Sequence, residues 1–248
     1  MSKSTAIVSS AISPSIGNLH GTYPGLIDPV SRLQQTIETV DALVTLGVSD
    51  IIIADNSGPN WNFEWARQLE PAKVHAIQMQ QFRNKGITEI YTLLDALPLL
   101  PEDTPIIKLS GRYSLRQRLD ERLDHQDFVF RRYSRSNKSD GRRAGMSYGH
   151  VSTVAYAVRN KAILGELLVQ CLREVFGYSA RVVGGRSLFR LMKNSFAPLN
   201  DRYDYHDPGV SIELGMLRAL QALRLSGVYI DKLDVSGISG QDGKVFIE

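Results

Sequence analysis

Hydrophobic and polar positions along the chain repeat with two periods, and the first unit they predict is a strand, a helix and a second strand. An apolar run covers residues 5–10, and a loop rich in Gly, Pro and Ser follows it to residue 28. Apolar positions at helical spacing then predict an amphipathic helix that Asp28 caps, Pro29 begins and Gly47 ends. The β-branched run over 50–55 is typical of a parallel strand that is buried on both faces.

The alternation continues to the end of the chain. The pattern predicts helices over 63–69, 85–97, 161–176 and 211–225, and strands over 74–79, 104–110, 127–133, 151–158 and 228–235. Strands and helices in this order favour a mostly parallel sheet with helices on both faces. Because no linker rich in Pro, Gly or Ser divides the 248 residues, we expect a single α/β domain.

Composition narrows the class of function. Hydrophobic residues make up 43% of the chain and charged residues 22%, as in ordinary globular proteins. The single cysteine, Cys171, falls in an apolar helical pattern and is predicted to be a core residue. The first apolar run is too short for a signal sequence or a membrane span, so we expect a cytoplasmic protein. One cysteine and five histidines show no zinc-ligand spacing, and no Gly-x-Ser-x-Gly or Walker pattern occurs.

Polar residues and glycines stand where several predicted strands end. They are Ser9 and Ser10 in the first strand, Asp55 and Asn56 in the second, and Ser110, Gly111, Arg112 and Tyr113 after the run that starts at residue 104. In open parallel sheets, ligands bind beyond the carboxyl ends of the strands, so we expect these residues to share one site. Asp55 and Asn56 also fit a simple Asx turn completed by Ser57 and Gly58.

The helix predicted over 85–97 begins with Asn84, Lys85 and Gly86. A glycine and amide donors at the start of a helix can hold an anionic or polar group. The alternative is a plain helix start with a solvated lysine. The strand after this helix ends at Gly111 and Arg112, so the two segments would face the same crevice.

The densest group of positive charge lies between residues 131 and 143. It contains Arg131, Arg132, Arg135, Lys138, Arg142 and Arg143. Such a segment can be a solvated loop, a lid over an anionic substrate, or a nucleic-acid-binding loop with stacking tyrosines. We expect no nucleic-acid partner, because the net charge is only +3 and no other part of the chain matches a nucleic-acid-binding module.

Three segments together resemble a known family. "IIIADNSG", "RNKGITEIYTLLDAL" and a strand that ends in Lys-x-Ser-Gly-Arg-Tyr are similar to nucleotide-sugar-dependent glycosyltransferases of the A-type (GT-A-like) fold, in particular bacterial surface-polysaccharide enzymes. The resemblance covers the first half of the chain and reaches the second half through "HDPGVSIELGMLRAL" and "VSGISG". It implies a nucleotide-diphospho-sugar transferase-like fold, with a nucleotide-binding half over 1–115 and an acceptor-binding half over 116–248.

The resemblance also implies an activity. A nucleotide sugar would be the donor substrate, with no other cofactor, and the acceptor would be a glycan or a lipid-linked glycan in lipopolysaccharide or capsule synthesis. A lipid-linked acceptor also allows peripheral association with a membrane. The alternative is a non-catalytic nucleotide- or glycan-binding protein of the same fold.

The strand that ends at Ser110 departs from the family pattern. In that fold it usually ends in Asp-x-Asp, which holds a divalent metal on the sugar diphosphate. Arg112 stands there instead, and a fixed cation can stabilise a leaving phosphate as a metal does, so we expect a metal-independent enzyme. A structural arginine paired with a core carboxylate is the alternative. Alternation places Lys108 and Ser110 on the same face as Arg112, with Lys108 further from the strand end.

The resemblance places a catalytic base near the amino end of a late helix. Glu213 is the first candidate and Asp207 the second, because an inverting transfer needs a carboxylate that reaches the acceptor hydroxyl. Acids at helix ends are also common as cap or dipole partners, and a retaining mechanism would need no such base. The candidate catalytic residues are therefore Glu213, Arg112 and Asp207, and the candidate substrate-binding residues are Ser9, Ser10, Asp55, Asn56, Asn84, Lys85, Gly86, Lys108, Ser110, Gly111, Tyr113 and His206.

Overall fold

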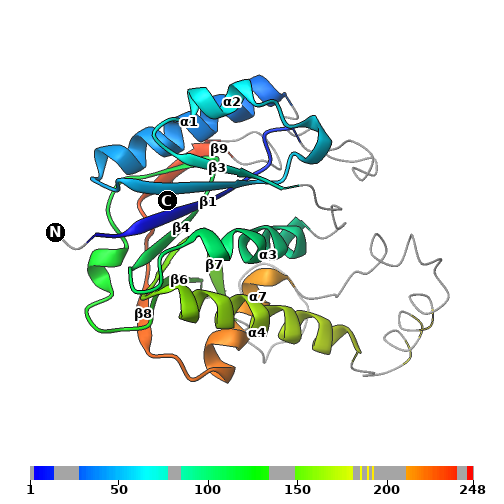
Figure 1. Cartoon of the computed structure of the whole chain (residues 1–248). Coiled ribbons are helices and arrows are strands. Elements are labelled where there is room, and N and C mark those ends of the chain that lie inside the picture. The colour runs from blue at the N-terminus through cyan, green and yellow to red at the C-terminus, as the bar shows by residue number, and fades with distance from the viewer. Residues whose placement is uncertain are drawn as a thin grey trace.

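The structure is a computed structural model, shown in Figure 1. It describes residues 3–13, 28–77, 85–133, 149–180, 211–238 and 245–247, together with residues 185, 189 and 192. Strands from both halves of the sequence join in one central sheet, and helices cover both of its faces (Figure 1). The predicted fold class, a single α/β domain built on a mostly parallel sheet, is confirmed.

The central sheet has seven strands in the order β3-β2-β1-β4-β7-β6-β8. Their bounds are β1 Thr5–Ser10, β2 Asp50–Asp55, β3 Lys73–Ala76, β4 Ile106–Ser110, β6 Phe128–Tyr133, β7 His150–Val158 and β8 Gly227–Ile230. β7 is antiparallel to both of its neighbours, and the other strand pairs are parallel. The amino end of β7 therefore lies at the same edge of the sheet as the carboxyl ends of the other strands.

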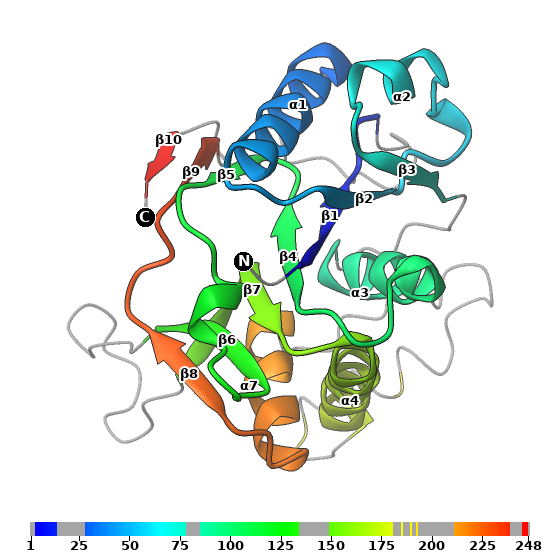
Figure 2. The ribbon, with the colours of Figure 1, turned by 60° about the vertical axis from the view of Figure 1, so that its left-hand side comes forward.

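Two helical layers enclose the sheet. On one face lies α1 (Pro29–Thr45), with the short α2 (Glu64–Gln68) next to it, and on the other lie α3 (Lys85–Ala96), α4 (Lys161–Ala180) and α7 (Ile212–Ala222) (Figure 2). Single 3-10 turns occur at η2 Gly58–Asn60, η3 Leu97–Leu99 and η4 Asp120–Arg122. Successive apolar side chains along β1, β2 and β4 point to opposite faces of the sheet, so they pack alternately into the apolar cores on its two faces.

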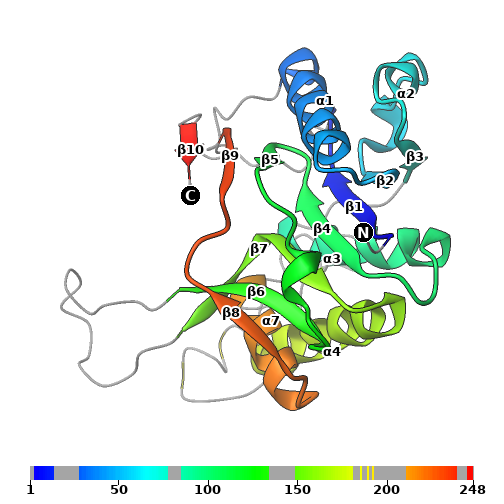
Figure 3. The same ribbon diagram turned by 90° about the vertical axis from the view of Figure 1, so that its left-hand side faces the viewer.

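A second sheet of three strands, β10-β9-β5, packs beside α1 (Figure 3). Its strands are β5 Tyr113–Leu115, β9 Val235–Ile238 and β10 Val245–Ile247. The hydroxyl of Thr39 on α1 donates to the carbonyl of Tyr113 over 3.1 Å, which ties β5 to the helix. The small sheet thus begins just after β4, next to the predicted site.

Local signals explain most element boundaries. The Asp28 carboxylate accepts the backbone amides of Val30 and Ser31 at 3.2 and 2.9 Å, as an N-cap does, and Gly47 ends α1 with a φ of 77°. Cys171 is fully buried in α4, as predicted, and burial raises the pKa of its thiol to about 12. None of the helices in the described ranges is long and apolar enough to cross a membrane.

One strand prediction is wrong. The run over 228–235 is not continuous, because the chain leaves β8 after Ile230 and begins β9 at Val235 in the other sheet. Asp234 stands at the break with a φ of 51°, a conformation that an extended strand does not contain. Its carbonyl accepts the amide of Arg116 at 3.0 Å, and its carboxylate accepts the side-chain amide of Gln117. These contacts fix the turn, and they join positions too far apart in the sequence for a local pattern to show.

Gly237 on β9 has no room for a side chain. A Cβ atom there would lie 2.2 Å from the carbonyl oxygen of Arg112 and 2.6 Å from the ring of Tyr113. We expect Gly237→Ala to lower the free energy of unfolding by about 1–3 kcal/mol, because the backbone must move to relieve the clash. The measurement is chemical denaturation beside Gly177→Ala, whose Cβ would meet nothing within 4 Å on α4 and which should be neutral or stabilising. Equal effects of the two substitutions would contradict the close packing at Arg112.

Candidate functional site

The carboxyl ends of β1, β2 and β4 lie side by side, and the first turns of two helices meet at the same edge. Ser10 pairs with Asp55 across β1 and β2, and Ser9 pairs with Ser110 across β1 and β4. A Cβ atom on Gly86, in the first turn of α3, would lie 2.5 Å from the side chain of Ile212 at the start of α7. Gly86 therefore lets α3 and α7 approach each other at the edge where the sequence predicts a site.

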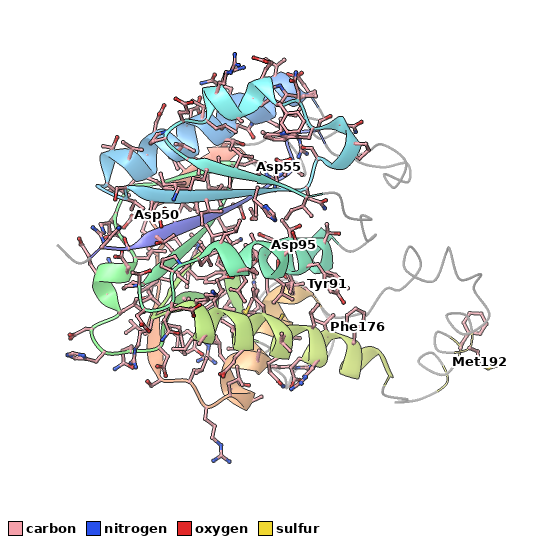
Figure 4. All side chains as sticks on the ribbon, in the orientation of Figure 1. Asp50, Asp55, Tyr91, Asp95, Phe176 and Met192 are labelled. Atoms are coloured by element: carbon pink, nitrogen blue, oxygen red, sulfur yellow. The ribbon has the colours of Figure 1, made fainter. Side chains whose placement is uncertain are left out.

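Asp55 and Asn56 lie at the carboxyl end of β2, at this edge of the sheet. The Asp55 carboxylate is fully buried and accepts the backbone amides of Ile12, at 3.0 Å, and of Ser57, at 2.8 Å. The second contact is the Asx turn that the sequence also allowed. Asn56 is buried, and its backbone amide donates to the carbonyl of Ser10 at 2.9 Å. These contacts hold the loops after β1 and β2 together, and contact with a nucleotide stays a prediction. Figure 4 marks the two ends of β2 by Asp50 and Asp55.

Arg112 follows directly after β4 and is half-buried. Its backbone amide donates to the carbonyl of Ser110 at 2.7 Å, which closes a tight turn through Gly111. Within the described part of the chain, its guanidinium makes no hydrogen bond or ion pair, so the core carboxylate of the alternative interpretation is not found there. A half-buried cation with no partner is costly, and a bound anion would relieve that cost.

A second arginine lies close to the first. Arg32 extends from α1 and donates from Nη1 to the carbonyl of Ala11 at 2.8 Å. Burial and then the positive charge of Arg112 lower the pKa of Arg32 to about 10, and the carboxylate of Asp55 opposes them. Two cations that repel each other at one edge would both be stabilised by a ligand with more than one negative charge. The sequence pattern does not single out Arg32, because a lone arginine near the start of a helix looks like a solvated charge.

Lys108 and Glu89 form an ion pair beneath the same edge. The side chain of Lys108 is only 1% exposed and contacts the Glu89 carboxylate on α3, the Ser110 hydroxyl at 3.1 Å and the carbonyl of Thr153 on β7. The hydroxyl of Ser9 donates to Glu89 at 2.7 Å. Lys108, Ser9 and Ser110, all predicted from sequence, are thus brought together, and Glu89 at their centre was missed.

The environment of Glu89 keeps its carboxylate charged. Burial alone would raise its pKa, but the charge and hydrogen bond of Lys108, the hydrogen bond of Ser9 and the charge of Arg112 together lower it below its ordinary value. Three groups therefore supply this carboxylate with positive charge and donors, and it is ionised at neutral pH.

This lowered pKa predicts an acid-dependent loss of stability. A carboxylate with a lowered pKa in the folded state contributes stability above its unfolded pKa, near 4.5, and loses that contribution as the pH falls through the folded pKa. We expect the free energy of unfolding to fall more steeply below pH 4.5 in the wild type than in Glu89→Gln, which has no such proton to bind. Chemical denaturation across pH 7 to 3 measures both slopes, and parallel curves would contradict the charged state of Glu89.

A cleft of about 370 Å³ opens next to this ion pair, between the amino end of β7 and the first turn of α7. Its wall includes Glu213 and the N-cap residue Ser211, whose hydroxyl accepts the amide of Leu214 at 3.4 Å. Thr153 lines the cleft, and its carbonyl also accepts from Lys108, so the cleft and the ion pair share a wall.

Two aromatic side chains also line the cleft. The rings of Tyr133 and His150 line the cleft and stack with centroids 4.7 Å apart and planes 15° apart. The guanidinium of Arg131 lies 4.2 Å from the centre of the Tyr133 ring, and its Nη1 donates to the Tyr133 hydroxyl at 3.1 Å. Aromatic side chains and a carboxylate in one cleft suit a sugar, which presents C–H groups and hydroxyls together.

The remaining predicted residues fall into two groups. Gly111 donates its amide to the carbonyl of Ser9 at 2.9 Å, and the Tyr113 ring is 8% exposed in the core under α1. Asn84, His206, Asp207 and the side chain of Lys85 lie outside the described residues, as do residues 134–143 of the basic segment. In the ranges that the structure describes, no three His, Cys, Asp or Glu side chains gather as metal ligands.

Comparisons with known proteins give similarities of fold. No protein-family model and no curated protein sequence matches this chain. Among solved structures, it is similar to a putative glucose-1-phosphate thymidylyltransferase from Bacillus anthracis, with 10% identity, a TM-score of 0.45 and coverage of 97% of this chain and 90% of the other. A nucleoside-diphosphate-sugar pyrophosphorylase from Vibrio cholerae matches with 12% identity, a TM-score of 0.46 and coverage of 91% and 90%. A putative nucleotide-diphospho-sugar transferase from Desulfovibrio desulfuricans matches with 10% identity, a TM-score of 0.46 and coverage of 93% and 80%.

Proposed function

We propose that the protein is a glycosyltransferase that moves a sugar from a nucleotide-activated donor to a glycan or lipid-linked acceptor in bacterial surface-polysaccharide synthesis. The observation that supports this most is the half-buried guanidinium of Arg112, which has no partner among the described residues and lies close to Arg32 at the carboxyl edge of the sheet. Two cations at this edge suit the diphosphate of a nucleotide sugar. A lipid-linked acceptor would bring the protein to a membrane surface.

The cleft next to this edge supports the second half of the proposal. Glu213, Tyr133 and His150 all line it, and an acceptor sugar could lie there with one hydroxyl near the carboxylate. The oxygen of that hydroxyl would attack the anomeric carbon of the donor while its proton passes to Glu213. The bond between the anomeric carbon and the phosphate oxygen would break, and the nucleoside diphosphate would leave with the electron pair.

Arg112 would supply the charge that the leaving group needs. Negative charge grows on the phosphate oxygen as the bond breaks, and a fixed cation stabilises that charge more in the transition state than in the bound donor. The planar guanidinium can hold two phosphate oxygens at once, which a lysine ammonium cannot. On this proposal the reaction needs no divalent metal.

A panel of nucleotide sugars tests the proposal. The protein is incubated with UDP-, GDP-, dTDP-, ADP- and CDP-linked sugars, and free nucleotide is measured without added acceptor. Slow nucleotide release from one donor, accelerated by a suitable glycan acceptor, is the expected result. Tight binding of a donor without turnover would favour the non-catalytic alternative. Release of pyrophosphate from a nucleoside triphosphate and a sugar 1-phosphate would instead show nucleotidyl transfer and contradict the proposal.

A further inference from the structure

The mechanism proposed above uses Arg112 and Glu213 and leaves Glu89 without a role. The three donors that reach its carboxylate all contact the same oxygen, Oε1: the Ser9 hydroxyl at 2.7 Å, the Lys108 ammonium, and the Ser110 hydroxyl at 3.4 Å. Over the residues that the structure describes, Oε2 accepts no hydrogen bond. The side chain of Glu89 is 23% exposed, whereas that of Lys108 is 1% exposed. One oxygen is thus fixed from within the protein, and the other remains available.

The position of Lys108 would also suit an apolar residue. Lys108 stands in a row across the sheet between Ile7 and Tyr156, which are 0% and 1% exposed. An apolar residue would pack in such a row, and buried ion pairs are often no more stabilising than apolar residues of similar volume. The pair does, however, hold a carboxylate in one orientation, as binding sites require.

The free oxygen also has a defined chemical preference. An ionised carboxylate accepts hydrogen bonds and donates none, so its ligand must carry a hydroxyl or an N–H group. The positive charge of Arg112 is close enough to act on Glu89. If the phosphates of a ligand contact Arg112, the group next to the phosphates would therefore reach Glu89. In a nucleotide sugar, the diphosphate has a hydroxyl-bearing ring on each side, the ribose and the transferred sugar.

We infer that Glu89 is a binding residue for a hydroxyl of the donor, with Oε2 as the acceptor atom, and that Lys108 is a positioning residue that fixes this carboxylate. The inference rests on the proposed function, because it takes the ligand to be a nucleotide sugar. The hydroxyl can belong to the ribose of the nucleotide or to the transferred sugar, and the two sources give different binding results.

Calorimetric binding tests this role. The probes are the nucleoside diphosphates of uridine, guanosine, thymidine, adenosine and cytidine, the deoxy forms of whichever one binds, and the matching nucleotide sugar. We expect Glu89→Gln to weaken binding of the probe that carries the contacted hydroxyl by about ten- to a hundredfold, because a hydrogen bond to a charged acceptor is lost. The control is Asp95→Asn on the same helix, and it should bind like the wild type. The Asp95 carboxylate, labelled in Figure 4, pairs with His75 at 2.8 Å.

The probes separate the two sources of the hydroxyl. If the ribose supplies it, the wild type should prefer the ribonucleotide to a deoxy form by about the same factor, and Glu89→Gln should lose that preference. If the transferred sugar supplies it, Glu89→Gln should weaken only the nucleotide sugar. Lys108→Met should reduce the same discrimination although it does not touch the ligand, and a purely structural role would leave the discrimination unchanged.

Three outcomes decide the inference. Equal binding of every probe by the wild type and by Glu89→Gln would overturn the role of Glu89. Failure of every nucleotide to bind the wild type would instead remove the proposed function. If Glu89→Gln does not fold, the double variant Glu89→Gln with Lys108→Met replaces it, because this variant removes both charges together. The same comparison is then made with the double variant, between ribo and deoxy probes and between nucleotide and nucleotide sugar.

Discussion

Arg112→Ala should lower turnover by about two to three orders of magnitude, the cost of removing one preorganised transition-state donor. The guanidinium is half-buried at the carboxyl edge of β4 and has no partner among the described residues, so its loss should leave the fold intact. Arg112→Lys should recover activity only in part, because an ammonium cannot hold two phosphate oxygens in a planar fork. Steady-state kinetics on the donor identified by the panel measures all three proteins.

A control and a chelator sharpen this test. Arg67→Ala removes an exposed arginine on α2, whose side chain is 79% exposed beside Glu64, and it should change turnover little. The assay is repeated with a chelator of divalent metals, and the wild type should keep its activity. If the chelator abolishes turnover and magnesium or manganese restores it, a metal site supplies the charge and the fixed-cation mechanism is wrong.

Glu213→Gln should lower turnover by about a hundredfold or more and leave nucleotide binding near normal. The carboxylate lies in the wall of the cleft beside β7, in the first turn of α7, where it can reach an acceptor hydroxyl. Glutamine keeps the shape of the side chain but cannot take the proton. Turnover with donor and acceptor, together with calorimetric binding of the nucleoside diphosphate, separates the two effects.

The matched control for this variant is Glu64→Gln, because the Glu64 side chain is 67% exposed on α2. It should leave both turnover and binding unchanged. If Glu213→Gln also has unchanged turnover, the base is Asp207 or the mechanism needs no base. A stereochemical assay of the product would then distinguish a retaining reaction from an inverting one.

The sequence predicted the order of strands and helices in most of the fold because local signals mark their ends. Asp28, Pro29 and Gly47 bound α1, and the β-branched run over 50–55 forms β2 within the buried part of the sheet. The run over 228–235 failed because it has apolar residues on both sides of a break that only tertiary contacts create. Those contacts join Asp234 to residues near 116, which no local pattern contains.

The residues of the candidate site also differ in whether the sequence could predict their position. Ser9, Ser110 and Arg112 could be placed together because parallel strands end at one edge of a sheet. Lys108 was expected to matter less because it lies back from the strand end, and the structure buries it in an ion pair. Its partner Glu89 looked like any acidic residue on a helix, since its position against Lys108 depends on how α3 packs on the sheet.

A crystal structure with the nucleoside diphosphate of the active donor bound would show whether Arg112 holds the leaving phosphate. We expect the diphosphate at the carboxyl edge of β1, β2 and β4, within hydrogen-bond distance of the Arg112 guanidinium, with its terminal phosphate facing the cleft that contains Glu213. A nucleotide bound elsewhere, or a diphosphate held at this edge by a metal with Arg112 turned away, would contradict this expectation.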